Sequence, residues 1–584
     1  MPATLSRPFP DPPSTLPAAL RRAARHFPER GIAVLDGRGR SHERRNYPEL
    51  LQAVTRSAGA LAALGVEPGD RVLVALPTSW GFLEAWLGAV WLGALPVAVA
   101  PPAGLGTGSA QIDKVARIAA SLDARRVVAP SGLAATLLRP EAPPAHQALA
   151  ARLIDPEGLR ATAPRTWGEP NASADALAFL QLTSGSTGLP RAVAIPHRAI
   201  VHNAFAIDEA IGAPAGGPTR EWADSLVSWL PLHHDMGLVG CLWVAILAGL
   251  DLWLLPPTAF LARPRLWLEQ LGRHGQAYAH APNFGFQLCI ERLSAEERAS
   301  LDLSPWRFAM TGAEMIRPET ARGFVEAFGP SGFRAESWRC CYGLAEATLG
   351  VSLDVAGRGL RTRALPAAQA EFARAIDPEL REIACLGPPL RDTRLRIAAA
   401  DGASLPEGEI GEVRVQGPGV FAGYFGDAEA TAEALGTGPD GASELRTGDL
   451  GLLHQGELYL TGRIKDLLIV RGHNLAPHEI EWLAEAVAGG GGALRSGAVS
   501  VAHGAQGEAA VLVMETLEKD PERQQQLARE VREKVSEGLG LLLADVRFVR
   551  RGQIPKTTSG KVQRRALREA YLRGQLGLAE SDEP

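Results

Sequence analysis

Cysteine is scarce in this chain, and its few cysteines follow no pairing pattern. The 584 residues include five, namely Cys241, Cys289, Cys340, Cys341 and Cys385. They show neither C-x-x-C spacing nor an even-numbered framework. This excludes a disulfide scaffold and argues against a structural zinc site. It fits a reducing compartment, so we expect a cytoplasmic protein.

A large excess of one charge is also lacking. Lys and Arg number 60 against 65 Asp and Glu, which gives a net charge of -5. The chain therefore offers no broad basic field for nucleic acid or anionic lipid. We expect no nucleic-acid partner.

Long unbroken hydrophobic runs are missing as well. The apolar stretch 85–103 is interrupted by Pro96, and the stretch 236–257 by Asp251. Each is more typical of a buried helix that leads into a buried strand than of a membrane span. Residues 1–17 hold several prolines and no apolar run, so we expect neither a secretory signal nor a transit peptide.

From about Arg71 the sequence alternates short apolar runs such as "RVLVALP" with Ala/Leu-rich helical stretches. This alternation predicts an α/β fold with largely parallel sheets covered by helices. The pattern changes near 459–481, after which come a strand pair, a charged helix and a lysine-bearing tail. The sequence therefore predicts a large α/β body followed by a small α+β domain.

The stretch "TSGSTGLPRAV", residues 183–193, has the composition of a phosphate-binding loop. Glycine lets the backbone approach closely, and hydroxyl and amide groups can donate to anionic oxygens. It is not a Walker A loop, because Leu189 and Pro190 follow the second glycine where Lys and Ser/Thr are required. A flexible Ser/Gly linker is the alternative. The candidate phosphate ligands are Thr183, Ser184, Gly185, Ser186, Thr187 and Gly188.

Seven further motifs follow this loop along the chain. They are "WLPLHHDMGLVG" (229–240), "MTGAEMI" (310–316), "CYGLAEATL" (341–349), "GEVRVQGPGVFAGYF" (411–425), "RTGDLG" (446–451), "GRIKDLLIVRG" (462–472) and "IPKTTSGKVQRR" (554–565). Together the eight resemble the adenylate-forming superfamily of acyl-CoA synthetases, peptide-synthetase adenylation domains and luciferases. Arg191 and Ala192 stand where that family commonly has Lys and Gly.

The resemblance implies an N-terminal adenylation domain over 1–462 and a mobile C-terminal lid over 463–584, with a hinge near Lys465. It also implies ATP and Mg²⁺ as cofactors. Such an enzyme joins a carboxylate to AMP and releases pyrophosphate.

Several residues could bind the nucleotide. Tyr342, followed by Gly343, offers a face for adenine, Asp449 can accept both ribose hydroxyls, and Arg463 can reach ribose or phosphate oxygens. Taken singly, Asp449 and Arg463 are more typical of helix caps or surface ion pairs. By resemblance, Gly312, Ala313 and Glu314 line the adenine.

Four residues are candidates for the chemistry, namely Glu346, His234, Lys561 and Arg463, the last of which is also a candidate nucleotide ligand. Glu346 can hold Mg²⁺, although an isolated glutamate is more often a solvated surface charge. His234 lies where the family places a histidine beside the reacting carboxylate. A metal site at His233 and His234 is disfavoured, because adjacent residues do not point the same way on a regular element.

Lys561 matches the family lysine that enters the site for adenylation. An ammonium ion there would offset the negative charge that gathers at the α-phosphorus in the transition state. The competing interpretation is the solvated start of a basic helix, since Arg564 and Arg565 follow.

The motif wording is most similar to the fatty acyl-AMP ligase branch, which implies a medium- or long-chain fatty acid and a separate acyl carrier protein as acceptor. Polyketide or lipopeptide biosynthesis would be the setting. We expect Trp229, Phe284 and Phe286 to line an apolar acyl pocket. The alternatives are a fatty acyl-CoA synthetase, with CoA as acceptor, and a catalytically silent nucleotide-binding protein.

A long stretch between Leu349 and Cys385 supports this branch. Its excess, near 354–375, lies where the resemblance places an extra segment that packs on the large domain and hinders the lid from reaching a CoA-competent arrangement. A variable surface loop is the alternative.

Overall fold

The computed structural model describes most of the chain. The described residues are 12–102, 108–137, 143–168, 170–183, 190–212, 224–364, 382–470, 473–488, 495–502, 508–539, 541–556 and 561–577. Among them, no helix is long and apolar enough to cross a membrane. Both apolar runs fold as predicted, with helix α3 (Trp80–Leu92) leading to strand β4 (Leu95–Ala98) and helix α10 (Val244–Ala248) to strand β10 (Asp251–Leu254).

A six-stranded sheet forms one layer of the α/β body, in the order β6-β5-β3-β4-β7-β8. All neighbours are parallel except β7 and β8. Its other strands are β3 (Arg71–Val74), β5 (Arg126–Val128), β6 (Leu153–Ile154), β7 (Leu177–Leu182) and β8 (Ala192–Pro196). Alternate residues face opposite sides, so Val72 packs in the core with α3, and Leu73 in a second core with α4 (Gly108–Ser121).

An eight-stranded sheet forms a second layer, in the order β14-β13-β12-β11-β9-β10-β1-β2, with antiparallel pairs only at its two edges. Its strands besides β10 are β1 (Gly31–Leu35), β2 (Ser41–Asn46), β9 (Ser225–Ser228), β11 (Ala277–Ala281), β12 (Trp306–Thr311), β13 (Trp338–Gly343) and β14 (Gly350–Leu353).

Helices cover both faces of this eight-stranded sheet. Trp338 lies against Phe286 of α13 (Asn283–Arg292) and Phe324 of α15 (Pro318–Phe328), at ring distances of 4.4 and 6.0 Å. The next residue, Arg339, points the other way and donates to the carbonyl of Ile211 in α8 (His197–Gly212). The apolar core is continuous through both layers.

The remaining helices of the body are short or lie at its margins. They are α1 (Leu16–His26), α2 (Tyr47–Ala63), α5 (Gly132–Leu137), α6 (Pro144–Ala150), α7 (Pro156–Ala161), α9 (Asp235–Gly237), the π-helix η1 (Leu238–Trp243), α11 (Pro257–Ala262), α12 (Arg265–Arg273), α14 (Ala295–Ala299) and α16 (Ala428–Ala434), with 3-10 turns η2 (Gly329–Ser331), η3 (Ala335–Ser337) and η4 (Ala345–Ala347).

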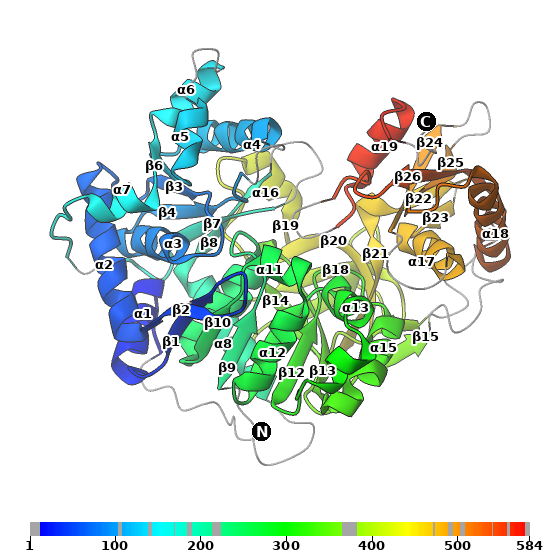
Figure 1. Cartoon of the computed structure of the whole chain (residues 1–584), viewed down its shortest axis with the longest axis horizontal. Coiled ribbons are helices and arrows are strands. Elements are labelled where there is room, and N and C mark those ends of the chain that lie inside the picture. Colours follow the sequence, from blue (N-terminus) through cyan, green and yellow to red (C-terminus); the bar gives the residue numbers. More distant parts are fainter. Residues whose placement is uncertain are drawn as a thin grey trace.

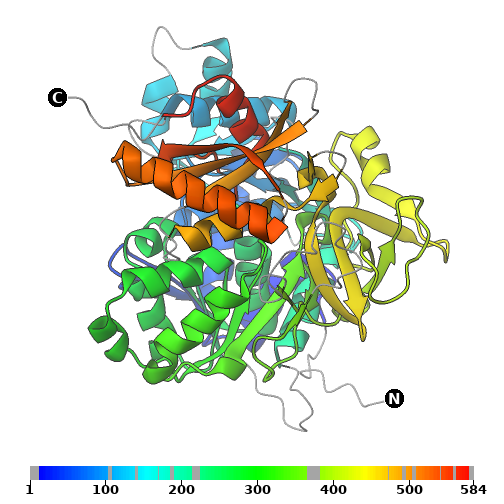
Figure 2. The same ribbon diagram turned by 90° about the vertical axis from the view of Figure 1, so that its right-hand side faces the viewer.

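A third, antiparallel sheet follows, visible in yellow in Figure 2. It contains β17 (Arg394–Ala398), β18 (Gly411–Gln416), β19 (Leu435–Thr437), β20 (Ser443–His454) and β21 (Glu457–Arg463). The turn between β20 and β21 uses Gln455 and Gly456, both at positive φ, as a two-residue hairpin requires. A small pair, β15 (Thr362–Ala364) and β16 (Glu382–Ala384), lies beside β21.

After the short 3-10 turn η8 (Ile464–Asp466), the last elements gather on one side of the molecule (Figure 1). The three-stranded sheet β24-β25-β26 and the pair β22-β23 are flanked by helices and have their own apolar clusters. The predicted strand pair and charged helix are confirmed. The elements are β22 (Leu468–Val470), β23 (His473–Leu475), α17 (Pro477–Val487), β24 (Ser496–Ala502), β25 (Glu508–Thr516), α18 (Pro521–Leu539), β26 (Leu543–Arg550) and α19 (Arg564–Leu572).

Candidate active site

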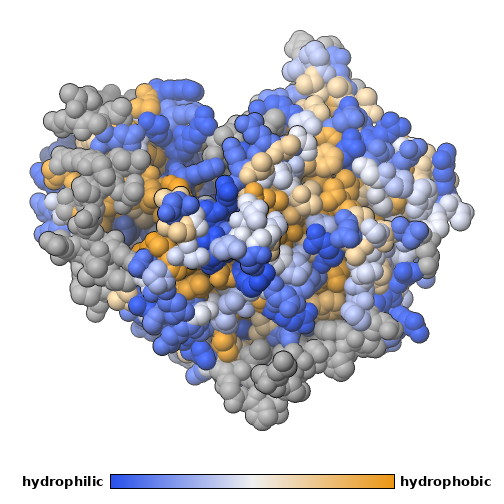
Figure 3. All heavy atoms as spheres, turned by 180° about the vertical axis from the view of Figure 1, so that it is seen from behind, coloured by the Kyte–Doolittle hydropathy of each residue, from blue (hydrophilic) through white to orange (hydrophobic). Residues whose placement is uncertain are grey.

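A cleft of about 2610 Å³ runs between the α/β body and the C-terminal elements. Seen from behind, the surface is hollowed between the two upper parts of the molecule (Figure 3). Most of the predicted site residues that the structure describes line this cleft. They are Thr183, Arg191, His234, Phe284, Ala313, Glu314, Tyr342, Gly343, Glu346, Asp449, Arg463, Lys465 and Lys561.

Three candidate nucleotide ligands form one hydrogen-bonded group. The hydroxyl of Tyr342 donates to Oδ2 of Asp449 over 2.6 Å, and Nε of Arg463 donates to Oδ1 over 2.6 Å. Asp449 and Arg463 are direct partners across β20 and β21, while Tyr342 comes from β13. The group therefore joins the eight-stranded sheet to the antiparallel sheet.

Backbone geometry explains the small residues of two motifs. A Cβ on Gly312 would lie 2.7 Å from Sγ of Cys341, and one on Gly343 only 2.0 Å from the carbonyl oxygen of Leu349. Ala313 has a φ of +69°, which is uncommon for a residue other than glycine. This turn lets the side chain of Glu314 accept a hydrogen bond of 2.7 Å from the amide of Phe284.

Glu346 lies in η4 and is held by a tyrosine that motif matching did not assign. The hydroxyl of Tyr424 donates to Oε1 of Glu346 over 2.7 Å. The guanidinium of Arg191 lies over the Tyr424 ring, 5.1 Å from its centroid. Burial raises the pKa of Glu346 above its ordinary value. The charged Arg191 is thus tied to Glu346 through Tyr424.

His234 pairs with its neighbour Asp235. Its Nδ1 lies 2.8 Å from Oδ1 of Asp235. Burial acts to raise the pKa of Asp235, but His234 and Lys561 outweigh it, so the pKa is below its ordinary value. Burial lowers the pKa of His233 to about 3. His233 is absent from the cleft wall as far as the chain is described.

Lys561 reaches into the cleft from the C-terminal elements, just before α19. Burial lowers its pKa, Arg463 adds to the effect, and the carboxylates of Asp235, Asp449 and Glu314 oppose it. The side chain is partly buried among charged groups of the α/β body. This environment differs from the solvated helix start that was the alternative interpretation.

The loop that the sequence predicts to bind phosphate is described only at its ends. Ser184, Gly185, Ser186, Thr187 and Gly188 lie outside the described residues. The amide of Thr183, at the end of β7, donates to the carbonyl of Arg191 over 2.9 Å. The two residues therefore close the base of a hairpin between β7 and β8.

The three aromatic residues predicted for the acyl pocket are in different places. Phe284 lines the cleft, whereas Trp229 and Phe286 are not among the described lining residues. Trp229 stacks on Phe260 at 3.9 Å, and Phe286 packs against Trp338 inside the core.

Part of the apolar lining comes from the side of the eight-stranded sheet that faces α8. Ile207, Met310, Cys341 and Leu349 line the cleft there. We call this part of the cleft the inner chamber. Its wall residues come from α8, β12, β13 and the turn before β14.

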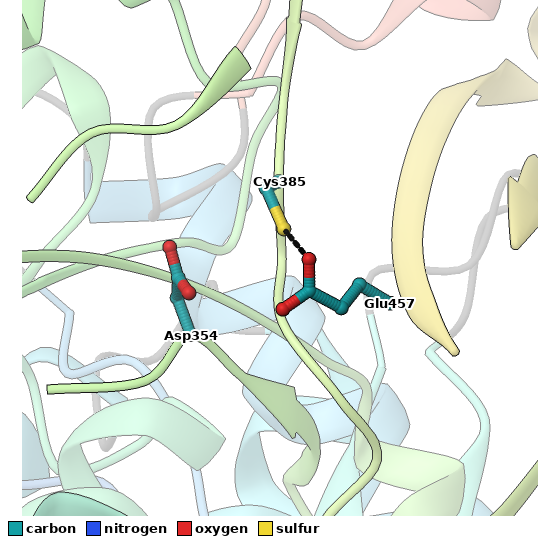
Figure 4. Close-up of side chains that lie close together, drawn as sticks. All are labelled: Asp354, Cys385 and Glu457. Carbon is teal, nitrogen blue, oxygen red and sulfur yellow. Dashed lines mark hydrogen bonds between the residues drawn. The ribbon is translucent and has the colours of Figure 1, made fainter. Parts of the chain in front are cut away.

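Asp354, Cys385 and Glu457 place one potential ligand atom each within 4.8 Å of one another, as Figure 4 shows. Arg361 occupies the centre of this cluster, with hydrogen bonds of 2.5 Å to Asp354, 2.6 and 2.7 Å to Glu457, and 3.1 Å to Cys385. Burial raises the pKa of the Cys385 thiol to about 11. A cation is excluded by the guanidinium, so the cluster fits an ion-pair network and not a metal site.

Several contacts hold the C-terminal elements against the body. Arg317 donates to Glu485 of α17 over 2.6 Å and lies 5.2 Å from the ring centroid of Trp482. Arg495 lies 5.3 Å from the ring of Phe284. In this arrangement Lys561 faces the body's carboxylates.

Sequence reasoning missed Tyr424, Arg317 and Glu485. Tyr424 stands inside the quoted motif "GVFAGYF", so its position within a motif was the available signal. Arg317 directly follows the motif at 310–316, whereas Glu485, 168 residues further on, lies outside the quoted motifs, and no sequence pattern pairs the two.

Comparison with known families decides the class of this site. The model of the family described as AMP-binding enzyme matches residues 20–425. The chain belongs to the AMP-binding enzyme family. It is an AMP-forming ligase of the adenylate-forming superfamily, and such enzymes use ATP.

Curated relatives of this AMP-binding enzyme match over nearly the whole chain. A protein of Caulobacter vibrioides, provisionally named an acyl-CoA synthetase, is 36% identical, with 94% of each chain covered. The medium-chain-fatty-acid–[acyl-carrier-protein] ligase JamA of Moorena producens is 31% identical, with 88% of each chain covered. The long-chain-fatty-acid–AMP ligase FadD26 of Mycobacterium tuberculosis is 32% identical and covers 86% of this chain and 87% of its own.

A solved structure confirms the fold of this AMP-binding enzyme. A chain from a study of fatty acyl-adenylate ligases of E. coli and L. pneumophila superposes with a TM-score of 0.84 at 30% identity. The alignment covers 97% of this chain and 99% of the other.

Proposed function

We propose that the protein activates a medium- or long-chain fatty acid with ATP and passes the acyl group to the phosphopantetheine thiol of a separate carrier protein. The fatty acid carboxylate attacks the α-phosphorus of ATP, forming acyl-AMP and releasing pyrophosphate. The thiol then attacks the acyl carbonyl carbon, the thioester forms, and AMP leaves.

The observation that carries this proposal is the position of Lys561. It lies in the cleft with Asp235, Asp449 and Glu314, close to the group of candidate nucleotide ligands. An ammonium ion at this point can stabilise negative charge as it gathers at the α-phosphorus. We assign His234, paired with Asp235, to the reacting carboxylate.

We assign the ribose to Asp449 and Arg463, which Tyr342 holds in one hydrogen-bonded group. The adenine would lie against Tyr342 beside Gly312, Ala313 and Glu314. Thr183 and Arg191 stand at the base of the hairpin assigned to the phosphates. These roles rest on the motif resemblance and on the shared cleft.

Glu346 fits a Mg²⁺ ligand, because a carboxylate oxygen is a donor that this ion prefers and Tyr424 fixes the side chain. Bound Mg²⁺ would neutralise phosphate charge. The chain's own contribution is to orient the Glu346 carboxylate toward the cleft.

We propose a boundary after residue 462, with residues 463–584 as a lid that pivots at Lys465. The exposed turn η8, which contains Lys465, separates β21 from the C-terminal sheets and supports this division. Lys465→Pro fixes φ and should slow alternation between the two half-reactions. Unchanged rates of both half-reactions would contradict the pivot.

The inner chamber is our candidate for the acyl chain, together with Phe284 at the outer wall of the cleft. The wall residues Ile207, Met310, Cys341 and Leu349 are apolar, as a fatty acyl chain requires. Trp229 and Phe286 would support this wall from behind, by packing against other side chains of the core.

The acceptor is the point at which the relatives differ. The names of JamA and FadD26 support a carrier protein or a released acyl-AMP, and the name of the Caulobacter protein supports CoA as the second candidate. A direct test incubates the enzyme with ATP, Mg²⁺ and decanoic acid, offering either CoA or a phosphopantetheinylated carrier protein. Robust acyl-CoA synthesis would favour the synthetase.

The extra segment offers a sharper test of why CoA would be excluded. Ala364 and Glu382 are paired neighbours in β15 and β16, so an Asn-Gly turn can replace residues 365–381. This replacement keeps Asp354 and Arg361, which a cut beginning at residue 354 would remove from the network described above. Acyl-CoA formation should rise relative to acyl-AMP release. If it does not, the segment is not the reason for the acceptor preference.

A further inference from the structure

Glu515 is a buried carboxylate at the end of strand β25, among the C-terminal elements. Alternate residues of a strand face opposite sides, and the side of β25 that carries Val511 and Val513 packs in an apolar cluster. Glu515 continues that row, with an exposed fraction of 3%. A buried charge is costly unless donors surround it, so the partners of Glu515 indicate why an acidic residue stands there.

Three donors from one short segment converge on this carboxylate. The backbone amides of Gly552 and Ile554 donate to Oε1 of Glu515 over 3.0 and 3.2 Å. Nζ of Lys556 donates to both oxygens, over 3.1 Å to Oε1 and 3.2 Å to Oε2. Glu515 therefore fixes the segment 552–556 on the end of β25.

The segment held in this way is paired with the segment that carries Lys561. Lys556 forms an antiparallel bridge with Val562, the residue next to Lys561. The amide of Gln563 donates to the carbonyl of Pro555 over 2.8 Å. The backbone position of the lysine therefore depends on the segment that the buried carboxylate holds.

A second carboxylate fixes the chain on the other side of Lys561. Arg564, at the start of α19, donates to both oxygens of Glu481 on α17. The amide of Ala498 in β24 also donates to Glu481, over 2.8 Å. The chain is thus anchored both before and after Lys561, and Glu515 is the anchor before it.

We propose that Glu515 is a positioning residue for adenylate formation, and that through the paired segments it sets the place at which Lys561 enters the cleft. This inference rests on the proposed function, in which Lys561 stabilises charge at the α-phosphorus. Glu515 and Lys556 border the cleft themselves, so a direct role of Lys556 at the phosphates is the alternative. Both oxygens of Glu515 accept from the segment 552–556, and the carboxylate therefore acts through that segment.

The test compares Glu515→Gln with the wild-type enzyme in ATP–pyrophosphate exchange with decanoic acid. The amide has the same shape but no charge to hold the ammonium group of Lys556. We expect kcat for exchange to fall about tenfold, because a displaced catalytic group loses rate steeply. The KM for ATP should change little, since the nucleotide ligands proposed above lie outside this segment. Acyl transfer from supplied decanoyl-AMP should keep its rate, with a carrier protein or CoA as acceptor, whichever the wild-type enzyme uses.

The deciding measurement is the same substitution in the Lys561→Ala variant. If Glu515 acts through Lys561, Glu515→Gln causes no further loss of exchange once the lysine side chain is gone. A direct role of Lys556 at the phosphates would add a loss of its own in this background.

Asp545→Asn is the matched control. Asp545 is another carboxylate of the C-terminal elements with several donors, from Arg547 and Tyr571, and it lies outside the cleft wall as far as the chain is described. This variant should keep the wild-type rate of exchange. Should Glu515→Gln not fold, Lys556→Met removes the same contact from the other side and should slow exchange alone, and Lys556→Arg should recover part of the loss.

The outcomes separate this inference from the proposed function. Unchanged exchange in Glu515→Gln, equal losses in exchange and acyl transfer, or a further loss in the Lys561→Ala background would each overturn the role of Glu515 and leave the proposed function intact. Failure of the wild-type enzyme to form any acyl-AMP would overturn the proposed function, and this inference with it.

Discussion

The hydroxyl of Tyr424 donates a hydrogen bond of 2.7 Å to Oε1 of Glu346, although the two residues are 78 positions apart. The contact links the antiparallel region that follows β18 to the turn after β13. It gives the proposed Mg²⁺ ligand a fixed orientation before any nucleotide binds. Arg191, which lies over the Tyr424 ring, connects this pair to the base of the hairpin that we propose holds the phosphates.

Tyr424→Phe should weaken the response to Mg²⁺. Removing a group that orients a metal ligand typically costs 10- to 100-fold in metal affinity, and we expect about a tenfold rise in the Mg²⁺ concentration needed for half-maximal exchange. Tyr571→Phe is a matched control, because Tyr571 also donates to a carboxylate, that of Asp545, but outside the cleft wall. An unchanged Mg²⁺ requirement in Tyr424→Phe would contradict the proposal that Tyr424 positions Glu346.

Lys561→Ala should separate the two half-reactions. We expect adenylate formation to fall by about 100- to 1,000-fold, as for loss of one well-placed group that stabilises the transition state. Acyl transfer from supplied acyl-AMP should continue. Lys534→Ala on α18, outside the cleft wall, is the control for loss of a lysine. Equal loss in both half-reactions would indicate damage to the fold.

The pH dependence of exchange should carry the signature of Lys561. Burial lowers its pKa, and its proposed role requires the protonated form. Therefore kcat/KM, which reports the free enzyme, should fall as pH rises through this lowered pKa, earlier than for an ordinary lysine. Lys561→Arg keeps its charge and should move the alkaline limb to higher pH. If the alkaline limb of the pH profile stays at the same pH in Lys561→Arg, it reports the ionisation of another group.

The ion pair between Arg317 and Glu485 should favour the first half-reaction, because it joins the body to α17 in the arrangement that brings Lys561 into the cleft. Arg317→Glu should slow exchange about fivefold, or about 1 kcal/mol. The reversed pair, Arg317→Glu with Glu485→Arg, should recover part of this loss. Arg265→Glu, which breaks a pair within α12, is the control. Additive losses in the double variant would exclude the coupling.

The sequence was sufficient to predict the class of fold and to name site residues that are far apart along the chain, because each motif carries its own local geometry. Tyr342, Asp449 and Arg463 were named from separate motifs, and the structure joins them through two hydrogen bonds. Gly312 and Gly343 illustrate this local geometry. A side chain at either position would collide with a neighbouring strand or turn, so the motif requires glycine there.

The acyl pocket could not be predicted in the same way. An aromatic residue near a motif can face the core or the cleft, and composition does not distinguish the two. Trp229 and Phe286 pack in the core, while Ile207 of α8 lines the chamber without any motif to mark it. The pairing of Arg317 with Glu485 likewise depends on how the C-terminal elements meet the body.

The most direct measurement of the central claim is mass spectrometry of the products formed from ATP, Mg²⁺ and fatty acids, with acetate and amino acids as comparison substrates. We predict acyl-AMP and pyrophosphate from medium- or long-chain acids, and an acylated phosphopantetheine arm when a carrier protein is added. Acyl-AMP from acetate or amino acids alone would contradict the fatty-acid assignment. ATP binding without any adenylate would contradict the proposed catalysis itself.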